Sequence, residues 1–332
     1  MTAVTFLGSD DVADLASMTD YVDAVWNAYR QRGEGAPAEP RTKLTNADPA
    51  GMLTTYAVVL PETGAMGGYM YAAGFGARDA WFVTPLFDAT TGELLAIVDG
   101  ASMNPFKTGA AGAVGVDALA RDDASTVGIV GSGAQARGQL RATVTVRDIQ
   151  HVRVYSPTRE NRDAFAEEMD ETLSASVEAV DSSAEAVSGR DVVITATNAS
   201  DPVFAGEDLS PGTHVTAMGQ YDPLKRELDE TTIERSVYVP DLRDRVFSDA
   251  GSFLHALESG VVGEDHVHAE LGDVVAGVAP GRTDDDQITV FDSGGTGIET
   301  VAAAHMLYEQ ALAEGRGTTV EFAPASEAPT GR

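Results

Sequence analysis

The stretch VGIVGSGAQARGQL, from Val127 to Leu140, decides how the rest of the chain is interpreted. It begins with apolar residues typical of a buried strand and continues as a helix, with Gly131-x-Gly133-x-x-Ala136 at the junction. The first glycine permits a tight turn, the second lets the backbone approach a phosphate, and the alanine allows the helix to pack closely on the strand. Because free amides and the positive helix end face this junction, we predict a dinucleotide site rather than an empty turn. The residues predicted to form it are Gly131, Gly133, Ala134, Gln135 and Ala136.

The end of the next predicted strand indicates which dinucleotide binds. Selection of NAD usually depends on an acidic residue about 20 positions after the glycines, which binds the ribose hydroxyls. No carboxylate is present there, and the sequence reads Ser156-Pro157-Thr158-Arg159. Two hydroxyls and a guanidinium suit a 2′-phosphate, so Ser156, Thr158 and Arg159 predict NADP(H) in preference to NAD(H). The alternative for Arg159 is an ordinary solvated residue at a helix start.

Strands and helices alternate from Ser125 onward, and this pattern predicts a parallel sheet with helices on both faces. The predicted fold class is therefore α/β, with a Rossmann-type doubly wound sheet. Such sheets bind ligands at the carboxyl ends of their strands. Thr197 and Asn198 end one predicted strand and become candidate cofactor contacts.

The remaining parts of the chain have simpler patterns. We expect a helix over 10–32 with Thr19 as its N-cap, followed by a β-rich region of short aromatic or β-branched runs. An alanine-rich helix follows, with Pro105 in its first position. A long amphipathic helix comes near the end of the chain, and residues 323–332 read as a loose tail.

Composition excludes several classes of protein. The 332 residues include 52 acidic side chains against 22 Lys or Arg, a net charge of −30 that repels nucleic acid and anionic membranes. The chain has no cysteine, and the pair His266 and His268 lacks a third ligand, so no metal site is predicted. No apolar run is long enough to span a membrane, and the start has no export signal, so we expect a cytoplasmic protein. The acidic, lysine-poor surface is typical of salt-adapted proteins.

Six stretches, taken together and in order, resemble the ornithine cyclodeaminase/mu-crystallin family. They span about residues 85–304, and PRTKL extends the similarity to Pro40. Because six ordered matches are far more specific than one glycine motif, the chain is identified as a member by resemblance. The stretches are FDATTGELLAIVDG, FKTGAAGAVGVDALA, STVGIVGSGAQARGQL, HVTAMGQYDPLKREL, HAELGDVVAG and VFDSGGTGIETVAAA.

The resemblance implies a two-domain subunit that forms a homodimer. A discontinuous α+β domain of residues 1–115 with 300–322 would mediate dimerisation and carry much of the substrate site, and residues 116–299 would form the Rossmann domain. The family includes ornithine cyclodeaminases that recycle NAD, alanine dehydrogenases, imino-acid reductases and an NADPH-binding crystallin. Their shared chemistry is hydride exchange at the α-carbon of an amino or imino acid. The resemblance also places Gly295 and Thr296 over the nicotinamide, whereas the residues alone indicate that Thr296 caps a helix.

The same resemblance assigns substrate contacts. Arg41 in PRTKL matches a family arginine that would hold the substrate carboxylate through two parallel hydrogen bonds. Lys43 lies two positions further on, so its side chain would point to the same face of an extended strand. The family sequence RTG is replaced by Lys107-Thr108-Gly109, so Lys107 and Thr108 are predicted to bind substrate. Lysine keeps the positive charge there but loses the fork geometry of arginine.

Two positions depart from the family pattern. Many members carry a lysine in the strand matching GGYMY, and Met70, which occupies that position, can neither donate a proton nor carry charge. Members often have an aspartate where this chain has Tyr221, with Asp222 one residue later. Two interpretations follow: a site that binds nucleotide without turnover, or a rearranged enzyme in which Lys43, Tyr221 or Asp222 exchanges the proton.

We therefore expect a homodimeric oxidoreductase that uses NADP(H), or NAD(H), and acts at the α-carbon of a small amino or imino acid. Arg41 and Lys107 would hold the carboxylate, and Lys43 or Asp222 would supply the proton. An ornithine cyclodeaminase-type lyase with recycled NAD is one alternative. An NADPH-dependent binding protein without turnover is the other.

Overall fold

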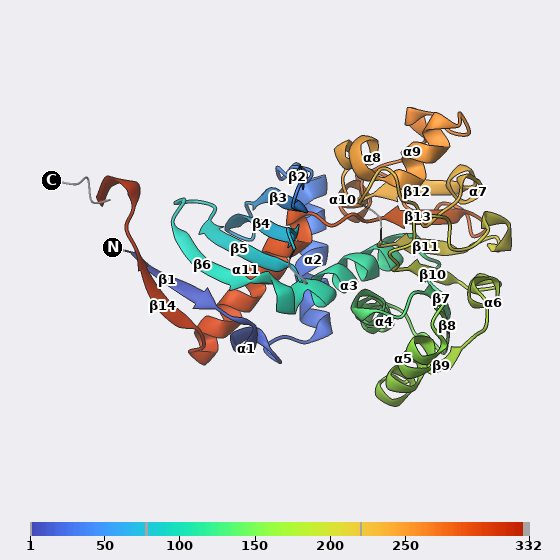
Figure 1. Cartoon of the computed structure of the whole chain (residues 1–332), viewed down its shortest axis with the longest axis horizontal. Helices are drawn as coiled ribbons and strands as arrows, with labels where there is room; N and C mark the ends of the chain where they lie inside the picture. The colour runs from blue at the N-terminus through green and yellow to red at the C-terminus, as the bar shows by residue number, and fades with distance from the viewer. Residues whose placement is uncertain (1, 77–78, 220, 328–332) are drawn as a thin grey trace.

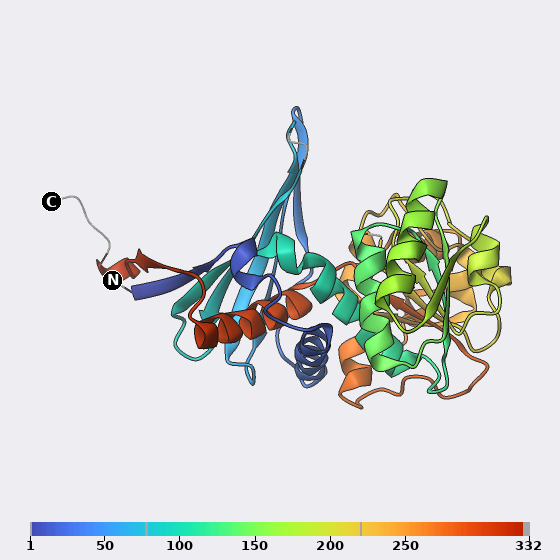
Figure 2. The same ribbon diagram turned by 90° about the horizontal axis from the view of Figure 1, so that it is seen from below.

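Two seven-stranded sheets, each with its own helices, form two lobes that lie side by side (Figures 1 and 2). The computed structural model describes residues 2–76, 79–219 and 221–327. The strand order is β14-β1-β6-β5-β4-β3-β2 in the first sheet and β12-β13-β11-β10-β7-β8-β9 in the second. Helix α3 (Gly100–Leu119) runs from the first lobe to the second and packs on α4 (Ala134–Val146).

All neighbouring strands of the second sheet are parallel, which confirms the predicted Rossmann-type arrangement. The chain runs outward through β8 and β9 on one side of β7, and through β10 and β11 on the other. The strand order therefore reverses between β7 and β10, where ligands bind in open α/β sheets. The strands are β7 (Thr126–Val130), β8 (His151–Tyr155), β9 (Ser176–Ala179), β10 (Val192–Thr195), β11 (His214–Ala217), β12 (Ser236–Pro240) and β13 (Ile288–Asp292).

Both faces of this sheet are buried, as the run of apolar residues in each strand requires. Val192 and Ile194 of β10 belong to one apolar cluster, whereas Val193 between them belongs to a second. Successive side chains point to opposite faces of a strand, so each face has a separate core. The helices of this lobe are α4, α5 (Arg159–Thr172), α6 (Ser183–Val187), α7 (Glu230–Glu234), α8 (Arg243–Asp249), α9 (Gly251–Glu258) and α10 (Leu271–Val275), with short 3₁₀ turns at Gly206–Asp208 and Glu264–His266.

The first sheet is mixed, with β1 and β6 parallel and the other neighbours antiparallel. Helix α11 (Gly297–Glu314) packs across β3, β4 and β5 and also contacts α2 (Met18–Gly33), so one face of the sheet is covered. The hairpin of β2 and β3 projects from the body of the lobe (Figure 2). The strands are β1 (Thr2–Leu7), β2 (Thr42–Ala47), β3 (Ala50–Leu60), β4 (Ala65–Gly74), β5 (Trp81–Asp88), β6 (Leu94–Asp99) and β14 (Thr318–Phe322).

Two helix starts differ from the sequence prediction. The expected helix over 10–32 is divided into α1 (Ser9–Val12) and α2, and Ser17 rather than Thr19 caps α2 by accepting a hydrogen bond from the amide of Asp20. Helix α3 begins at Gly100, so the prediction that Pro105 takes its first position is wrong. The Asp99 carboxylate accepts a hydrogen bond from Ala101 N at 3.0 Å and so sets the earlier start.

The first sheet contains strands from both ends of the chain, because β14 returns to pair with β1. The predicted boundaries at 115/116 and 299/300 fall inside α3 and α11. Residues 323–327 are exposed and include a short 3₁₀ turn, and the rest of the predicted tail, 328–332, lies outside the described residues. No helix in the described part of the chain is long and apolar enough to cross a membrane.

Candidate active site

A cavity of about 390 Å³ lies between the lobes, at the carboxyl ends of β7, β10, β11 and β13. Its second-sheet side is formed by the turns that follow those four strands. Its first-sheet side is formed by β3, β4, β5, the segment before β2, and the first half of α3. The cavity therefore lies where the strand order reverses and where the two lobes meet.

The junction between β7 and α4 has the shape that a dinucleotide phosphate requires. Gly131 has φ +121°, and a Cβ built on it would lie 2.3 Å from the carbonyl oxygen of Ala196. A Cβ on Gly133 would meet no atom within 4 Å, because this residue borders the open cavity. Gly133 is also the N-cap of α4, and no side chain caps the helix there. The first amides of α4 are thus available to an anion, and the residues present fit a dinucleotide.

The predicted cofactor residues are only partly brought together. Gly131 lies behind the cavity and Ala136 is buried, so they shape the turn and pack the helix on the sheet. Thr296 does not line the cavity, because its hydroxyl accepts from Ile298 N at 3.0 Å and caps α11. The helix-cap interpretation of Thr296 is therefore right, and the residue of this pair that reaches the cavity is Gly295. The predicted cofactor residues that do line the cavity are Gly133, Ala134, Gln135, Thr197, Asn198 and Gly295.

The residues predicted to select NADP(H) lie beyond the end of β8 and do not line this cavity. The Ser156 hydroxyl is buried and contacts the Ser132 hydroxyl at 2.9 Å, beside the glycine turn. Thr158 is the exposed N-cap of α5 and makes no side-chain cap. The Arg159 side chain is 73% exposed, with Asp163 at 3.5 Å. A cation held this loosely remains available to an anionic ligand.

Glu227 is a buried residue that supports the cavity wall and that the sequence did not reveal. Its carboxylate accepts hydrogen bonds from Thr197 N at 2.6 Å, Gly219 N at 2.9 Å and the Thr195 hydroxyl at 2.9 Å. Thr197 and Gly219 line the cavity, so Glu227 joins the turns that follow β10 and β11. Burial raises the pKa of this carboxyl. Its partners lie up to 32 residues away along the chain, which is why no local pattern indicated its role.

Arg41 lies in the cavity, as predicted, with only 4% of its side chain exposed. Its Nη2 donates to the carbonyl of Gly294, and its guanidinium centre lies 4.3 Å from the ring centroid of Tyr221. The carboxylate of Asp249 is 3.6 Å from Nη1, which is too far for a hydrogen bond. Within the described residues, Nε and Nη1 have no hydrogen-bond partner. A buried guanidinium with two unused nitrogen donors is suited to a ligand carboxylate.

Arg245 fixes the surroundings of Arg41 through a buried ion network. Its guanidinium contacts Asp241, Asp249 and Asp292 at 2.7, 2.8 and 2.6 Å. Asp241 in turn accepts hydrogen bonds from Gly294 N at 2.8 Å and from the next amide at 3.1 Å. The network therefore holds both the loop after β13 and the carboxylate nearest Arg41.

Lys107 is also buried in the cavity, with 1% of its side chain exposed. Its Nζ lies 3.4 Å from Oε1 of Glu299 and 4.9 Å from the ring centroid of Tyr69. Burial lowers the pKa of Lys107, and the nearby charge of Arg41 acts in the same direction. Thr108 lines the cavity too, but its hydroxyl is hydrogen-bonded to Asn104 O at 2.8 Å, so it forms part of the wall.

Three positions that the sequence placed at the reacting centre lie elsewhere. Lys43 is exposed on β2, and Asp222 accepts a hydrogen bond from Leu224 N at 3.1 Å; neither lines the cavity. Met70 is 46% exposed on the far face of β4, whereas Tyr69 and Tyr71 on either side of it line the cavity. Lys43, Asp222 and Met70 therefore lie outside the cavity lining, and Tyr69 and Tyr71 are the residues of this stretch of β4 that face it. Tyr221 does line the cavity, as predicted.

The lining has a clear chemical character. Among the described residues it contains two cations, Arg41 and Lys107, and no Asp or Glu. Four aromatic side chains from β3, β4 and β5 form an apolar wall, with neighbouring ring centroids 5.0 to 5.9 Å apart: Tyr56, Tyr69, Tyr71 and Phe82. No group of three His, Cys, Asp or Glu side chains among the described residues could hold a metal ion. The arrangement favours a small anion with an apolar body, next to a dinucleotide.

Known proteins share this sequence and fold. A Δ1-pyrroline-2-carboxylate reductase of Bacillus cereus is 35% identical over 241 residues, which are 72% of this chain and 74% of the relative. The reductase of the same name from Thermococcus litoralis, solved with NADH and L-proline, has 34% identity and a TM-score of 0.90 and covers 96% of this chain and 100% of its own. An archaeal alanine dehydrogenase dimer with bound NAD has 31% identity and a TM-score of 0.90, with 97% and 100% covered.

The fold defines a dinucleotide-dependent oxidoreductase, because the doubly wound sheet has the glycine junction after β7 and a cavity where its strand order reverses. The sequence model of the ornithine cyclodeaminase/mu-crystallin family matches residues 3–315, and the chain belongs to that family. Within the family it is an enzyme of the NAD(P)-dependent imino-acid reductase or alanine dehydrogenase type. The predicted family and reaction class are therefore confirmed.

Proposed function

We propose that the chain reduces a small cyclic imino acid to the corresponding amino acid, with NADPH as reductant. The observation that carries this proposal is Arg41, whose buried Nε and Nη1 have no hydrogen-bond partner within the described residues. Its side chain lies in a cavity that no acidic side chain lines among those residues. The aromatic wall suits the apolar ring of such a substrate. Relatives named for reduction of Δ1-pyrroline-2-carboxylate support the same choice.

The chain's own residues would bind and orient the substrate. Arg41 would hold the carboxylate through Nε and Nη1, and the stacked ring of Tyr221 would keep the guanidinium plane fixed. The aromatic wall would exclude water from the opposite side of the ring. When bound, the reduced nicotinamide supplies the hydride that adds to the imine carbon. Amides at the start of α4 and the turns at Thr197 and Gly295 would place the dinucleotide.

Substrate turnover by an Arg41→Lys variant tests the proposal. Lysine keeps the charge but gives up one of two charge-assisted hydrogen bonds, so kcat/KM should fall about 10- to 100-fold. Arg32→Lys is the matched control, because Arg32 pairs with Glu270 at 2.8 Å outside the cavity and its replacement should leave kcat/KM unchanged. Loss of reduced-nicotinamide absorbance is followed with cyclic imino acids. Wild-type protein that consumes no NADPH or NADH with any of them contradicts the proposed function.

The cavity argues against an ornithine cyclodeaminase-type lyase. A diamino acid carries a second ammonium group, and no carboxylate among the described residues lines the cavity to bind it. Incubation with ornithine and NAD should therefore release no ammonia. Ammonia release without a net change in nicotinamide absorbance would favour the lyase instead.

NADPH is proposed as the preferred reductant because the end of β8 offers hydroxyls and Arg159 in place of an acidic residue. Arg159→Gln removes the charge at an exposed position and should not affect folding. We expect the dissociation constant of NADPH to rise about tenfold, while that of NADH stays the same. Titration calorimetry with both cofactors measures the two constants. Tighter binding of NADH than of NADPH by the wild-type protein contradicts this preference.

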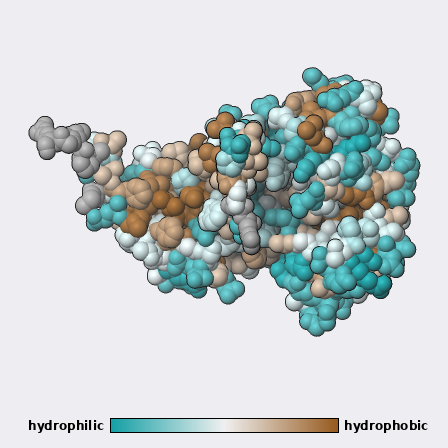
Figure 3. Space-filling view, viewed as in Figure 1, coloured by the Kyte–Doolittle hydropathy of each residue, from teal (hydrophilic) through white to brown (hydrophobic). Residues whose placement is uncertain are grey.

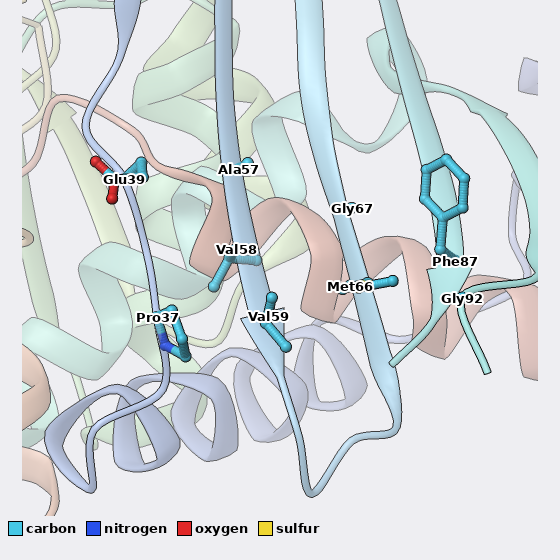
Figure 4. Close-up of a pocket in the computed structure, with 9 residues that line it drawn as sticks. All are labelled: Pro37, Glu39, Ala57, Val58, Val59, Met66, Gly67, Phe87 and Gly92. Carbon is cyan, nitrogen blue, oxygen red and sulfur yellow. The ribbon is translucent and has the colours of Figure 1, made fainter. Parts of the chain in front are cut away.

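We also propose that the chain is a homodimer formed through the outer face of the first sheet. Figure 3 shows apolar residues gathered on that lobe, and the face not covered by α11 includes exposed Leu44, Trp81 and Val83. A shallow cavity of about 470 Å³ lies on the same sheet, where Val59, Met66 and Phe87 project from neighbouring strands in front of α11 (Figure 4). An apolar face this extensive is typical of a protein–protein interface. The alanine dehydrogenase relative is itself a dimer.

A pair of aspartate substitutions tests the dimer. Val83 is 47% exposed on the apolar sheet face, and Val278 is 68% exposed in the other lobe. Val83→Asp should convert the protein to monomers in sedimentation velocity, because a charge would be buried in the interface without a partner. Val278→Asp should leave the mass unchanged. A wild-type monomer, or a dimer that survives Val83→Asp unchanged, contradicts this interface.

A further inference from the structure

The proposed reaction needs a proton donor for the substrate nitrogen. Lys43 and Asp222 do not line the cavity and cannot serve. Among the described residues that do line it, Lys107 is the only lysine, and the alternatives are tyrosines. Burial raises the pKa of Tyr56, Tyr69 and Tyr71, so their hydroxyls hold their protons more tightly than usual. The Tyr221 ring is stacked on the Arg41 guanidinium, which is the group that would hold the carboxylate.

Lys107 is held in the cavity with donor capacity to spare. An ammonium group has three N–H donors, and within the described residues the only hydrogen-bond partner of Nζ is Glu299 Oε1 at 3.4 Å. Glu299 is already engaged, because its two oxygens accept from Thr296 N and from the Thr296 hydroxyl, both at 2.6 Å. The remaining face of the ammonium lies over the ring of Tyr69 at the cavity wall. Glu299 therefore orients Nζ through one N–H donor and leaves the other two for a ligand.

The electrostatic surroundings favour release of that proton. Three elements face Nζ: α11 brings Glu299, the segment before β2 brings Arg41, and β4 brings Tyr69. Burial and Arg41 lower the pKa of Lys107, while Glu299 raises it and keeps the ammonium populated. A general acid works best when its pKa lies near the working pH, and a buried lysine approaches that condition more closely than an exposed one.

We propose that Lys107 is the catalytic proton donor and that Glu299 is its positioning residue, an inference that rests on the proposed reductase function. The bound nicotinamide would supply the hydride for the new C–H bond at the imine carbon, and Nζ would donate a proton to the nitrogen as the C=N π electrons move onto it. The products are the secondary amine, the oxidised nicotinamide and a neutral lysine, which regains its proton from solvent. This assigns Lys107 a different role from the carboxylate contact that the sequence suggested.

Two substitutions separate these roles. Lys107→Arg keeps a positive charge and improves carboxylate binding, but a guanidinium does not release its proton in a protein. Lys107→Met keeps the length of the side chain and removes both the charge and the proton. A carboxylate contact predicts that Lys107→Arg is as active as wild type. A proton donor predicts that both variants lose kcat about 100-fold or more, while KM changes less.

The pH dependence of kcat at saturating NADPH completes the test. Wild type should lose activity on the alkaline side as Lys107 deprotonates, and both variants should lack this limb. Glu299→Gln removes the charge that raises the lysine pKa, so the limb should move to lower pH, a shift that a merely structural role would not produce. NADPH affinity should match wild type in all variants, which shows that each is folded, and Lys107→Met covers the case in which the larger arginine disturbs folding.

The outcomes distinguish this inference from the function on which it rests. Wild-type protein that reduces imino acids, together with a Lys107→Arg variant that keeps kcat within about threefold, overturns the inference alone. The inference is also overturned if the pH profile of kcat for Lys107→Met keeps the same alkaline limb as wild type. Wild-type protein without reductase activity refutes the proposed function instead.

Discussion

Replacing the two glycines of the β7–α4 junction by alanine, one at a time, should separate folding from cofactor binding. At Gly133 an added methyl group meets no protein atom within 4 Å, and φ −83° suits any residue. At Gly131 the same methyl lies 2.3 Å from the Ala196 carbonyl, and φ is +121°. The two substitutions add the same atom to the same turn, so each is the control for the other.

The magnitudes follow from these contacts. Gly133→Ala should leave the free energy of unfolding the same or raise it by about 0.4–1 kcal/mol, because alanine restricts the unfolded chain. Its methyl group fills space next to the α4 amides, and loss of one charge-assisted phosphate contact costs about 1.5–3 kcal/mol, or about 10- to 150-fold in the dissociation constant of NADPH. Gly131→Ala should lower the free energy of unfolding by about 1–3 kcal/mol for the backbone conformation alone, and the clash adds to this.

Urea unfolding and calorimetric titration with NADPH measure both quantities on the same samples. We expect Gly133→Ala to be stable but weak in binding, and Gly131→Ala to be unstable or insoluble. A Gly133→Ala protein that binds NADPH as tightly as wild type would show that no phosphate lies against this turn. A Gly131→Ala protein as stable as wild type would refute the steric argument for the turn itself.

Three further substitutions have defined outcomes. Burial lowers the pKa of His214 from 6.5 to about 3. Between these two pH values the unfolded chain binds more protons than the folded chain, so the free energy of unfolding falls as the pH drops from about 6.5 toward 3. In urea, wild type should lose about 2 kcal/mol between about pH 7 and about pH 5 through this residue, and His214→Gln should lose less. Lys43→Met should leave kcat/KM within about threefold of wild type, because Lys43 is exposed outside the cavity. A larger loss would show that Lys43 takes part in the reaction. Glu227→Gln leaves one acceptor oxygen for the three donors that now bind the carboxylate. The free energy of unfolding should therefore fall by about 1–3 kcal/mol, and the dissociation constant of NADPH should rise. If neither value changes, Glu227 does not hold the turns at Thr197 and Gly219 in place.

The parts of the fold that depend on local pattern could be predicted from the sequence. The β7–α4 junction needs only neighbouring residues: an apolar strand, a glycine where φ is positive, and a small residue under the helix. The alternation of strands and helices from Ser125 onward likewise predicted the parallel sheet. Arg41 was a candidate because its segment resembled the family, and the structure adds that Nε and Nη1 have no hydrogen-bond partner in the described chain.

Other features depend on contacts distant in sequence and could not be predicted. Alternation in GGYMY places Tyr69 and Tyr71 on one face and Met70 on the other, but it does not show which face meets the second lobe. The partner of Lys107 lies 192 residues away on α11, so neither the burial of this lysine nor its charge environment had a local signal. The orientation of Asp222 was equally hidden, because the turn after β11 bends the carboxylate onto the amide of Leu224.

The two kinds of ion pair near the cavity explain why stability and binding do not compete. Arg245 contacts three carboxylates at 2.6 to 2.8 Å, and this fully engaged cation holds the second lobe together. Arg41 and Lys107 lie 3.6 and 3.4 Å from their carboxylates, which stand behind them and not in the cavity. These carboxylates offset part of the cost of burying a cation, but at that distance they leave the donors that face the cavity unused. A substrate carboxylate can therefore bind without breaking a strong ion pair, even though the whole chain carries a charge of −30.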